Sequence, residues 1–475
     1  MMVMGEFTQE TDVLVIGGGP GGYAAAFRAA DLGFDVTMVD AGERPGGVCL
    51  FRGCIPSKTL LYVSEVMHDA RSAGQMGVYF EEPRVDLKKL REWKNGVIDR
   101  LAGGLEELCK RRGVQFIKGR AAFESSDHAR LFDAEISHVK FRHAILATGS
   151  RPNPLPGVEF RKGGRVMGST GALELRDIPE RLLVVGGGYV GVELGSVYAS
   201  LGSRVTLVEF SERLMAGADA DLVQPLVKRL SELFAAIHTQ TRVKTLQEYD
   251  DRVEVVLEGE VNEPRQTFDR VLVSIGRSPN SRDIGLENTG VKVDERGFVL
   301  VDDQRRTGDA KIFAVGDVVG GAMLAHKAMY EGKVAAEVIA GKPSAFDVRA
   351  IPAVVFTDPQ IAWCGLTEEE ARRRNRPVKV SRFPWSASGR AVSMGVSKGL
   401  TKLIIDPESR SVLGMGIVGR EAGEMISEGV LAVEMSALAE DMALSMHPHP
   451  TLSETEEEAA EAFLGSSTHI LSQRN

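Results

Sequence analysis

Short apolar runs that end in glycine-rich turns mark the first part of the chain. Residues 12–16 have the length and composition of a buried parallel strand. They lead into the turn 17–22, an alanine-rich segment at 23–32 that predicts a helix, and a second apolar run at 35–39 that ends at Asp40. The pattern predicts a strand–turn–helix–strand unit.

The same order of elements returns later. An apolar run at 181–185 leads into the turn 186–191, a predicted helix at 192–201 and a second run at 204–208, which ends at Glu209. Parallel strands that alternate with helices build an α/β fold. Two such units therefore predict two Rossmann-like dinucleotide-binding domains.

Further apolar runs surround these units. Residues 144–148, 270–275 and 311–315 have the composition of buried strands, 60–108 is largely helical, and 114–141 is rich in strand formers. Connections of this kind complete the two sheets.

From about residue 349 the pattern changes to an α+β layout without a nucleotide-type turn. Strands are predicted at 354–357, 378–383, 399–405 and 412–418, and helices at 421–437 and 456–464. Prolines at 152, 154 and 156 mark another boundary. We therefore expect a first nucleotide-binding domain from 1–150 and 278–348, a second from 151–277, and a C-terminal domain from 349–475.

The glycine turns have the spacing of a dinucleotide-binding motif. Gly17 makes the first turn, Gly19 lets a pyrophosphate approach the backbone, and Gly22 packs the helix on the strand. Asp40 is placed to accept hydrogen bonds from a ribose. Asp317 also follows a strand, where it either binds a ligand or shapes a turn.

The second turn repeats this arrangement with Gly186, Gly188 and Gly191, and its acidic residue is Glu209. A carboxylate at this position repels a ribose 2′-phosphate, so the second unit favours NAD over NADP. Arg213 lies nearby and favours the opposite choice.

Residues 46–58 read GGVCLFRGCIPSK and hold two cysteines separated by four residues. Pro56 fits the first turn of a helix, whose positive end stabilises a thiolate. Cys49 and Cys54 are therefore predicted to form a redox-active disulfide. Two free buried cysteines or a structural crosslink are the alternatives; the crosslink is disfavoured in a cysteine-poor chain.

The sequence HPHPTLSE at 447–454 has two interpretations. His449 is either a proton carrier near neutral pH or a satisfied polar residue in a turn stiffened by proline. Glu454 has capping-box spacing to Thr451. A zinc site of His447, His449 and the two cysteines is disfavoured by its spacing, so no metal is expected.

Composition limits the partners. The 475 residues carry a net charge of −9 without a Lys/Arg block, which gives no reason to expect nucleic acid. No apolar segment has membrane length, and the N-terminus lacks the pattern of a secretory signal. We expect a cytoplasmic protein with no membrane partner.

Together these motifs resemble the pyridine nucleotide–disulfide oxidoreductase family over essentially the whole chain. The anchors are GGGPGG at 17–22, the cysteine stretch at 46–58, ATG at 147–149, GGGYVGVELG at 186–195, GRSPN at 276–280, AVGD at 314–317, MLAHKA at 323–328 and HPHPTLSE at 447–454. The resemblance is strongest to members that reoxidise dihydrolipoyl groups on the carrier protein of a 2-oxo acid dehydrogenase or glycine cleavage complex.

The resemblance implies FAD in the first unit, NAD in the second, and a homodimer built by the C-terminal domain. Residues expected to bind FAD are Gly17, Gly19, Gly22, Asp40, Gly47, Lys58, Thr148, Gly149, Asp317, Met323, Leu324 and Ala325. Residues expected to bind NAD are Gly186, Gly188, Tyr189, Gly191, Glu193, Glu209 and Gly276. The implied catalytic residues are Cys49, Cys54, His449 and Glu454, with Cys54 next to the flavin, Cys49 exchanging with substrate, and His449 reaching the disulfide of the other subunit.

Two other functions stay open at this point. One is a related NAD(P)H-dependent reductase with a different small disulfide substrate, and the other is a non-catalytic flavoprotein. The chain departs from the family pattern at Phe51 and Arg52, at Gln360 and at Ala322. We expect Arg52 to lower the pKa of a neighbouring thiolate and to affect substrate choice.

Overall fold

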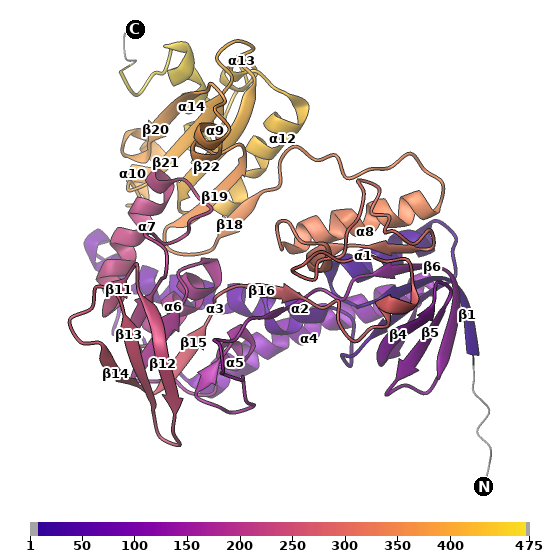
Figure 1. Cartoon of the computed structure of the whole chain (residues 1–475). Coiled ribbons are helices and arrows are strands. Elements are labelled where there is room, and N and C mark those ends of the chain that lie inside the picture. Colours follow the sequence, from indigo (N-terminus) through magenta and orange to yellow (C-terminus); the bar gives the residue numbers. More distant parts are fainter. Residues whose placement is uncertain (1–7, 472–475) are drawn as a thin grey trace.

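Three main sheets, two of them built on parallel strands and one antiparallel, carry the fold of residues 8–471, the part of the chain that this computed structural model describes (Figure 1). The α/β prediction with a C-terminal α+β domain is confirmed. Within residues 8–471, no helix combines the length and apolar composition needed to cross a membrane. The expectation about a secretory signal concerns the first residues, of which 1–7 lie outside the described range.

The first sheet places five parallel strands side by side. In spatial order they are β3 (Gln115–Lys118), β2 (Val36–Asp40), β1 (Thr8–Ile16), β6 (His138–Leu146) and β17 (Ile312–Ala314). An antiparallel meander of β4 (Arg120–Ser125) and β5 (His128–Phe132) joins the first residues of β6. Because β17 pairs with β6, a segment far along the chain returns to the first sheet.

Both faces of the first sheet are buried, as its apolar runs predict. Val13 and Val15 belong to one core cluster, and Leu14 and Ile16 to another. Helices α1 (Pro20–Asp31) and α8 (Ala325–Ile339) pack against each other, with residues of both in the first cluster. The helix predicted at 23–32 begins earlier because Pro20 is favourable in a first helical turn.

The second unit repeats this plan. Its parallel sheet has the order β11 (Ala236–His238), β10 (Arg204–Val208), β9 (Arg181–Val185), β15 (Arg270–Val273) and β8 (Val166–Met167). Its helices are α5 (Ser169–Glu174), α6 (Tyr189–Ser200) and α7 (Ala220–Leu233), and its meander is β12 (Arg242–Glu248), β13 (Val253–Glu258) and β14 (Arg265–Phe268). A sheet with an added meander therefore occurs twice in the chain.

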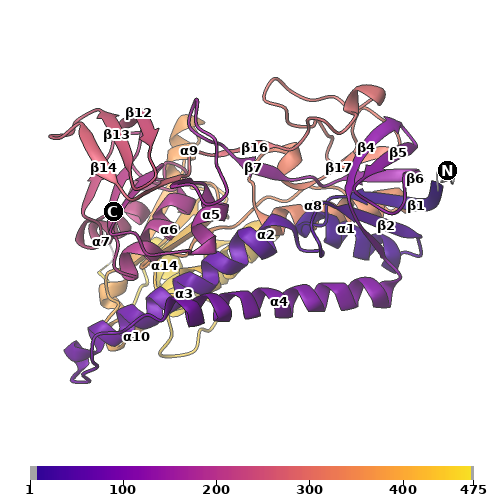
Figure 2. The ribbon, with the colours of Figure 1, turned by 90° about the horizontal axis from the view of Figure 1, so that it is seen from below.

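Two features join the units. Short strands β7 (Ser150–Pro152) and β16 (Arg277–Pro279) pair where the chain passes between the units. Helices α2 (Gly47–Arg52), α3 (Cys54–Ser72) and α4 (Leu87–Arg112) lie along one side, with α3 and α4 side by side (Figure 2). The prediction that 60–108 is largely helical is confirmed by α3, the 3₁₀ turn η1 (Ala73–Met76) and α4, which residues 77–86 separate. The remaining 3₁₀ turns are η2 (Leu286–Asn288), η3 (Gly316–Val319) and η4 (Trp385–Ala387).

The C-terminal domain follows an extended connection from α8 (Figure 1). Its antiparallel sheet has the order β18 (Ala353–Val355), β19 (Gln360–Gly365), β22 (Val412–Gly419), β21 (Leu400–Ile405) and β20 (Lys379–Pro384). Its helices are α9 (Glu368–Arg373), α10 (Gly389–Ser393), α11 (Ala422–Met425), α12 (Ser427–Met435), α13 (Ala439–Ala443) and α14 (Glu454–Leu464). The single helix predicted at 421–437 is wrong, since α11 and α12 divide that segment.

Candidate active site

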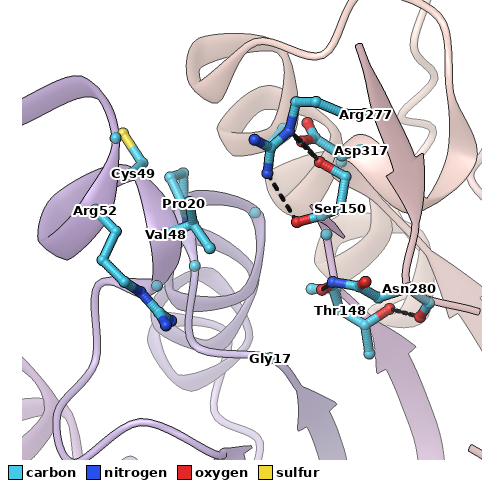
Figure 3. Close-up of a pocket in the computed structure, with 18 of the residues that line it drawn as sticks. Gly17, Pro20, Val48, Cys49, Arg52, Thr148, Ser150, Arg277, Asn280 and Asp317 are labelled. Atoms are coloured by element: carbon cyan, nitrogen blue, oxygen red, sulfur yellow. Dashed lines mark hydrogen bonds and ion pairs between the residues drawn. The ribbon is translucent and has the colours of Figure 1, made fainter. Parts of the chain in front are cut away.

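A cavity of about 780 Å³ lies where the strands of the first sheet end, and residues of both units line it. Figure 3 shows part of its wall, with Gly17 and Pro20 on one side and Ser150 and Asp317 on the other. The carboxyl ends of parallel strands are where α/β proteins bind nucleotides. The cavity therefore lies where the first glycine turn predicts it.

The first turn has the geometry of a pyrophosphate cradle. Gly17 has a φ of +107°, and a Cβ on Gly22 would lie 1.7 Å from the Gly17 carbonyl oxygen, so both positions require glycine. At Gly19 a Cβ would find its nearest neighbour, Gly47 Cα, at 4.0 Å. Gly19 thus leaves space for a ligand, as the sequence predicts.

Asp40 fixes this turn with both carboxylate oxygens. Oδ2 accepts a hydrogen bond of 2.6 Å from the Gly18 N–H, and Oδ1 accepts one of 2.7 Å from the Gly42 N–H. Asp40 also lines the cavity. It therefore holds the turn while facing the space where a ribose would lie.

The opposite wall comes from segments distant in sequence. Ser150 donates to Asp317 Oδ2, and the Arg277 guanidinium donates to Ser150 Oγ and to its carbonyl oxygen at 2.7 and 2.8 Å. Thr148 Oγ1 and Asn280 Nδ2 each donate to the other residue's carbonyl oxygen, at 2.6 and 2.9 Å. The sequence analysis missed Ser150, Arg277 and Asn280, although GRSPN at 276–280 was a signal for the last two.

Most residues predicted to bind FAD line this cavity. They are Gly17, Gly19, Asp40, Gly47, Lys58, Thr148, Gly149, Asp317, Met323 and Ala325. Two others lie beside it: Gly22 packs beneath the turn, and Leu324 is the residue that precedes α8.

The second turn closely repeats the first. Gly186 also has a φ of +107°, and a Cβ on Gly191 would lie 2.0 Å from the Gly186 carbonyl oxygen. Glu209 accepts hydrogen bonds from the N–H groups of Gly187 and Ser211 at 2.6 and 2.8 Å. These residues follow the strands of the second sheet, where a second nucleotide would bind.

The remaining residues predicted to bind NAD lie around this turn. A Cβ on Gly188 would meet no described atom within 4 Å, and a Cβ on Gly276 would meet only Asn153 Nδ2, at 3.6 Å, among the described residues. Tyr189 and Glu193, from α6 of the second unit, line the first cavity. The two nucleotide sites therefore meet at α6.

Cys49 and Cys54 lie in the cavity wall at the junction of two helices. Cys49 is in α2, and Cys54 is the first residue of α3, as the predicted helix N-terminus requires. A Cβ on Gly53 would lie 3.0 Å from the Val48 carbonyl oxygen, so glycine allows the close junction. Both residues are thiols in this structure.

The two thiols differ in acidity. The hydrogen bond between them and the charge of Lys58 lower the pKa of Cys54 to about 7, while the same hydrogen bond and burial raise the pKa of Cys49. Cys54 is therefore the thiolate of the reduced pair near neutral pH.

The charge that favours the Cys54 thiolate is that of Lys58. The prediction assigned this effect to Arg52, but the cation that lowers the pKa of Cys54 is Lys58. In Figure 3 the Arg52 side chain extends away from the Cys49 sulfur. The expected effect of Arg52 on substrate choice stays a prediction. Lys58 Nζ lies 2.8 Å from Glu193 Oε2 and 4.7 Å from the centre of the Phe356 ring. The Phe356 N–H donates to Glu193 Oε1 at 2.9 Å, so the pair joins both units to the C-terminal domain.

His449 and Glu454 form a second cluster, separate from the cavity lining. Glu454 Oε1 lies 2.7 Å from His449 Nδ1, and Glu454 Oε2 accepts a hydrogen bond from the Thr451 N–H at 2.6 Å. The carboxylate contacts the imidazole and reaches back to the Thr451 N–H, but the predicted capping box does not form, because α14 begins at Glu454 with Ser453 as its N-cap. The His449 side chain is 72% exposed.

Residues 11–332 match the family model described as pyridine nucleotide-disulphide oxidoreductase, and residues 351–460 match the dimerisation domain of the same family. The chain therefore belongs to the pyridine nucleotide-disulphide oxidoreductase family. The second match supports a homodimer.

Similar curated proteins carry the name dihydrolipoyl dehydrogenase. The one from Haemophilus influenzae is 45% identical over 463 residues, which cover 97% of this chain and 96% of that protein. The one from Geobacillus stearothermophilus is 44% identical over 473 residues, covering 99% and 100%. Among solved structures, LpdA from Mycobacterium tuberculosis has a TM-score of 0.88 at 26% identity, covering 95% of this chain and 99% of its own.

FAD and NAD are the cofactors of this family, and the residues fit both. The first cavity has the size of a cofactor site, with a glycine cradle at Gly19 and polar groups on the opposite wall. The second turn repeats the cradle beside Glu209, which favours NAD. When bound, FAD supplies two-electron transfer between a dithiol and a nicotinamide.

Proposed function

We propose that this chain oxidises dihydrolipoyl groups on a carrier protein and reduces NAD⁺, as a cytoplasmic homodimer. The observation that carries the proposal is the position of Cys49 and Cys54 in a cavity wall shared by two nucleotide-binding units. The similarity to dihydrolipoyl dehydrogenases over nearly the whole chain supports the substrate class. The other two cysteines, Cys109 and Cys364, are buried free thiols, which fits a reducing compartment.

The cysteines exchange with the substrate in two steps. A substrate thiolate attacks the sulfur of Cys49 in the oxidised pair, and Cys54 leaves as a thiolate. The second substrate thiol loses its proton and displaces Cys49, which gives the cyclic lipoyl disulfide and the Cys49–Cys54 dithiol. The low pKa of Cys54 makes it the better leaving group in the first step.

His449 is the proposed acid–base group, and Glu454 orients its ring. The imidazole accepts a proton from the substrate thiol and returns it later. The exposed His449 side chain is available to a second subunit, which supports a site built from two chains.

Steady-state turnover tests the proposal. We expect dihydrolipoamide with NAD⁺ to be the best substrate pair, compared with glutathione or small dithiols and with NADP⁺. Cys49→Ser should keep its flavin and lose at least about 1,000-fold in dihydrolipoamide turnover. Cys109→Ser is the matched control, because Cys109 is a buried thiol of the first core. A preference for the glutathione couple would favour the related-reductase alternative.

Mixed dimers test the shared site. Cys49→Ser and His449→Gln should each be inactive, whereas dimers that combine them hold one intact site if His449 serves the partner's cysteines. Random mixing gives mixed dimers as about half of the population, and each mixed dimer has one intact active site of two. About one quarter of the normal activity should therefore return. Turnover that stays at the level of the separate variants would contradict the two-chain site.

A further inference from the structure

A second histidine of the same motif lies in a separate, partly buried cluster in the C-terminal domain. His447 precedes α14, Glu428 is on α12, and Glu456 is in the first turn of α14. One ligand-type atom from each residue lies within 4.8 Å of the other two. Three segments of the domain therefore bring one nitrogen and two carboxylates together.

Glu456 is the unusual member of this cluster. The residue is 0% exposed, and no nitrogen or hydroxyl donor among residues 8–471 reaches either carboxylate oxygen; its carboxyl shares a hydrogen bond with the Glu428 carboxyl, and burial beside that charge raises the pKa of Glu456. A buried carboxyl group whose partner is another carboxyl is costly, so such groups normally serve a ligand or a functional role. Its oxygens face His447 and Glu428.

The other buried carboxylate cluster shows what a satisfied arrangement requires. Asp219, Asp221 and Glu368 are also close together, but Lys402 Nζ lies 2.7, 2.7 and 2.9 Å from them. A lysine ammonium thus occupies the place that a cation would take. In the His447 cluster the carboxylate of Glu456 lacks such a partner in the described chain.

The hydrogen bonds of His447 direct one ring nitrogen into the cluster. Nδ1 donates to the Ser445 carbonyl oxygen at 2.7 Å and lies 3.3 Å from Glu457 Oε2. A carbonyl oxygen only accepts, so Nδ1 carries a hydrogen, and Nε2 is the ring nitrogen that remains to bind a metal. Nε2 lies 3.0 Å from Glu428 Oε1 and shares a proton with that carboxylate, which a bound ion would displace.

We propose that Glu428, His447 and Glu456 bind a divalent transition-metal ion such as Zn²⁺. One imidazole nitrogen and two carboxylates are a donor set that Zn²⁺ and Co²⁺ accept, and a water completes a tetrahedral site. Ligands about 2.0–2.2 Å from such an ion lie roughly 3.4 Å apart, which the 3.0 Å between His447 Nε2 and Glu428 Oε1 approaches and the 4.8 Å limit on the other two pairs allows. The Ser445 carbonyl and Glu457 supply the outer contacts that orient a metal-binding histidine.

The site would connect a metal ion to the acid–base segment. Glu456 follows Glu454 by two positions in the first turn of α14, and His447 precedes His449 by two positions. A bound ion would therefore join α12 to both ends of the loop that carries His449.

Metal binding is tested on tag-free holoenzyme in its oxidised form, where the Cys49–Cys54 disulfide cannot act as a thiolate ligand. After chelator treatment and dialysis, equilibrium dialysis with Zn²⁺ should show one ion per chain. A Co²⁺ titration should give visible bands without the thiolate charge-transfer absorption of a cysteine site.

Variants identify the ligands. Glu456→Met fills the buried position with an apolar side chain and should weaken Zn²⁺ binding at least about tenfold. Glu428→Gln provides the same test at a less buried position, and flavin content reports whether either variant folds. Glu458→Gln, in the neighbouring pair with His469, is the control and should bind Zn²⁺ normally. The proposal would be overturned if the unaltered protein bound no Zn²⁺. It would also be overturned if folded Glu456→Met and Glu428→Gln bound Zn²⁺ as tightly as the unaltered protein, whatever their dehydrogenase activity.

Discussion

The two glycine turns are nearly the same local structure in different surroundings. Gly17 and Gly186 share a φ of +107°, and in each unit the acid at the end of the second strand accepts from the second glycine of the turn at 2.6 Å. The local sequence pattern accounts for this likeness, because glycine spacing and one carboxylate determine the turn.

Their surroundings differ. The first turn opens into the cavity walled by α2, the Asp317 segment and the loop at Gly149. Gly188 in the second turn has open space beside it, since a Cβ there would meet no described atom within 4 Å. An enclosed site suits a cofactor that stays bound, and an open site suits a nucleotide that exchanges at each turnover. The same motif thus serves two purposes according to what packs around it.

Substitution of the last glycine in the first turn should have the largest effect. In Gly22→Ala the new Cβ would lie 1.7 Å from the Gly17 carbonyl oxygen, so α1 must move away from β1. We expect the purified protein to lose most of its FAD, measured as the ratio of flavin absorbance to protein absorbance.

Gly19→Ala separates cofactor binding from folding. Its Cβ fits the described fold, with the nearest atom at 4.0 Å, and it would conflict only with a bound pyrophosphate. The variant should unfold at the temperature of the flavin-free parent protein and bind FAD more weakly. Normal flavin content in both variants would contradict the assignment of the first turn to FAD.

The equivalent change in the second turn should have a smaller and different effect. Gly191→Ala places a Cβ 2.0 Å from the Gly186 carbonyl oxygen and 2.7 Å from Ser274 Oγ. We expect full flavin content and a KM for NAD⁺ that rises about tenfold, which corresponds to about 1.4 kcal/mol. Steady-state kinetics at saturating dihydrolipoamide measure this KM. Loss of flavin from Gly191→Ala would show that the two turns are not independent.

The sequence predicts the parts of this molecule that depend on local pattern. The strand bounds at 181–185 and 204–208 agree with β9 and β10, because both runs are buried on two faces and end at turn residues. It misses β19 (Gln360–Gly365), whose residues lack a clear period of two. It also runs α11 and α12 together, because Ile426, which separates them, is an apolar residue with near-helical backbone angles, and it begins the helix at Glu421, which has a left-handed φ of +60° and precedes α11.

The candidate site shows the same difference between residues that a local pattern predicts and residues that a long-range contact brings in. Asp40 and Glu209 are predictable because each follows its turn at a fixed distance along one unit. Arg277 and Asn280 reach the cavity only through the pairing of β7 with β16, a long-range contact without a local pattern. The Lys58–Glu193 pair joins residues that are far apart in sequence, and its prediction came from the family resemblance.

The smallest predicted effect concerns the Lys58–Glu193 pair, where the two units meet. The pKa of Cys54 is lowered to about 7, so the thiolate is present above that pH and is protonated below it. Lys58→Met removes a stabilising positive charge and should move the titration upward, so that the thiolate appears only at higher pH. The negative charge of Glu193 partly cancels the effect of Lys58 on the Cys54 thiolate. We therefore expect the titration of Cys54 to move by roughly half a pH unit, and not by the full unit that removal of an unpaired charge would cause. The thiolate–flavin absorbance of the two-electron-reduced enzyme, followed against pH, measures the shift.

Arg52→Met is the matched control and should titrate like the unaltered protein. A larger shift in Arg52→Met than in Lys58→Met would show that Arg52, and not Lys58, stabilises the thiolate.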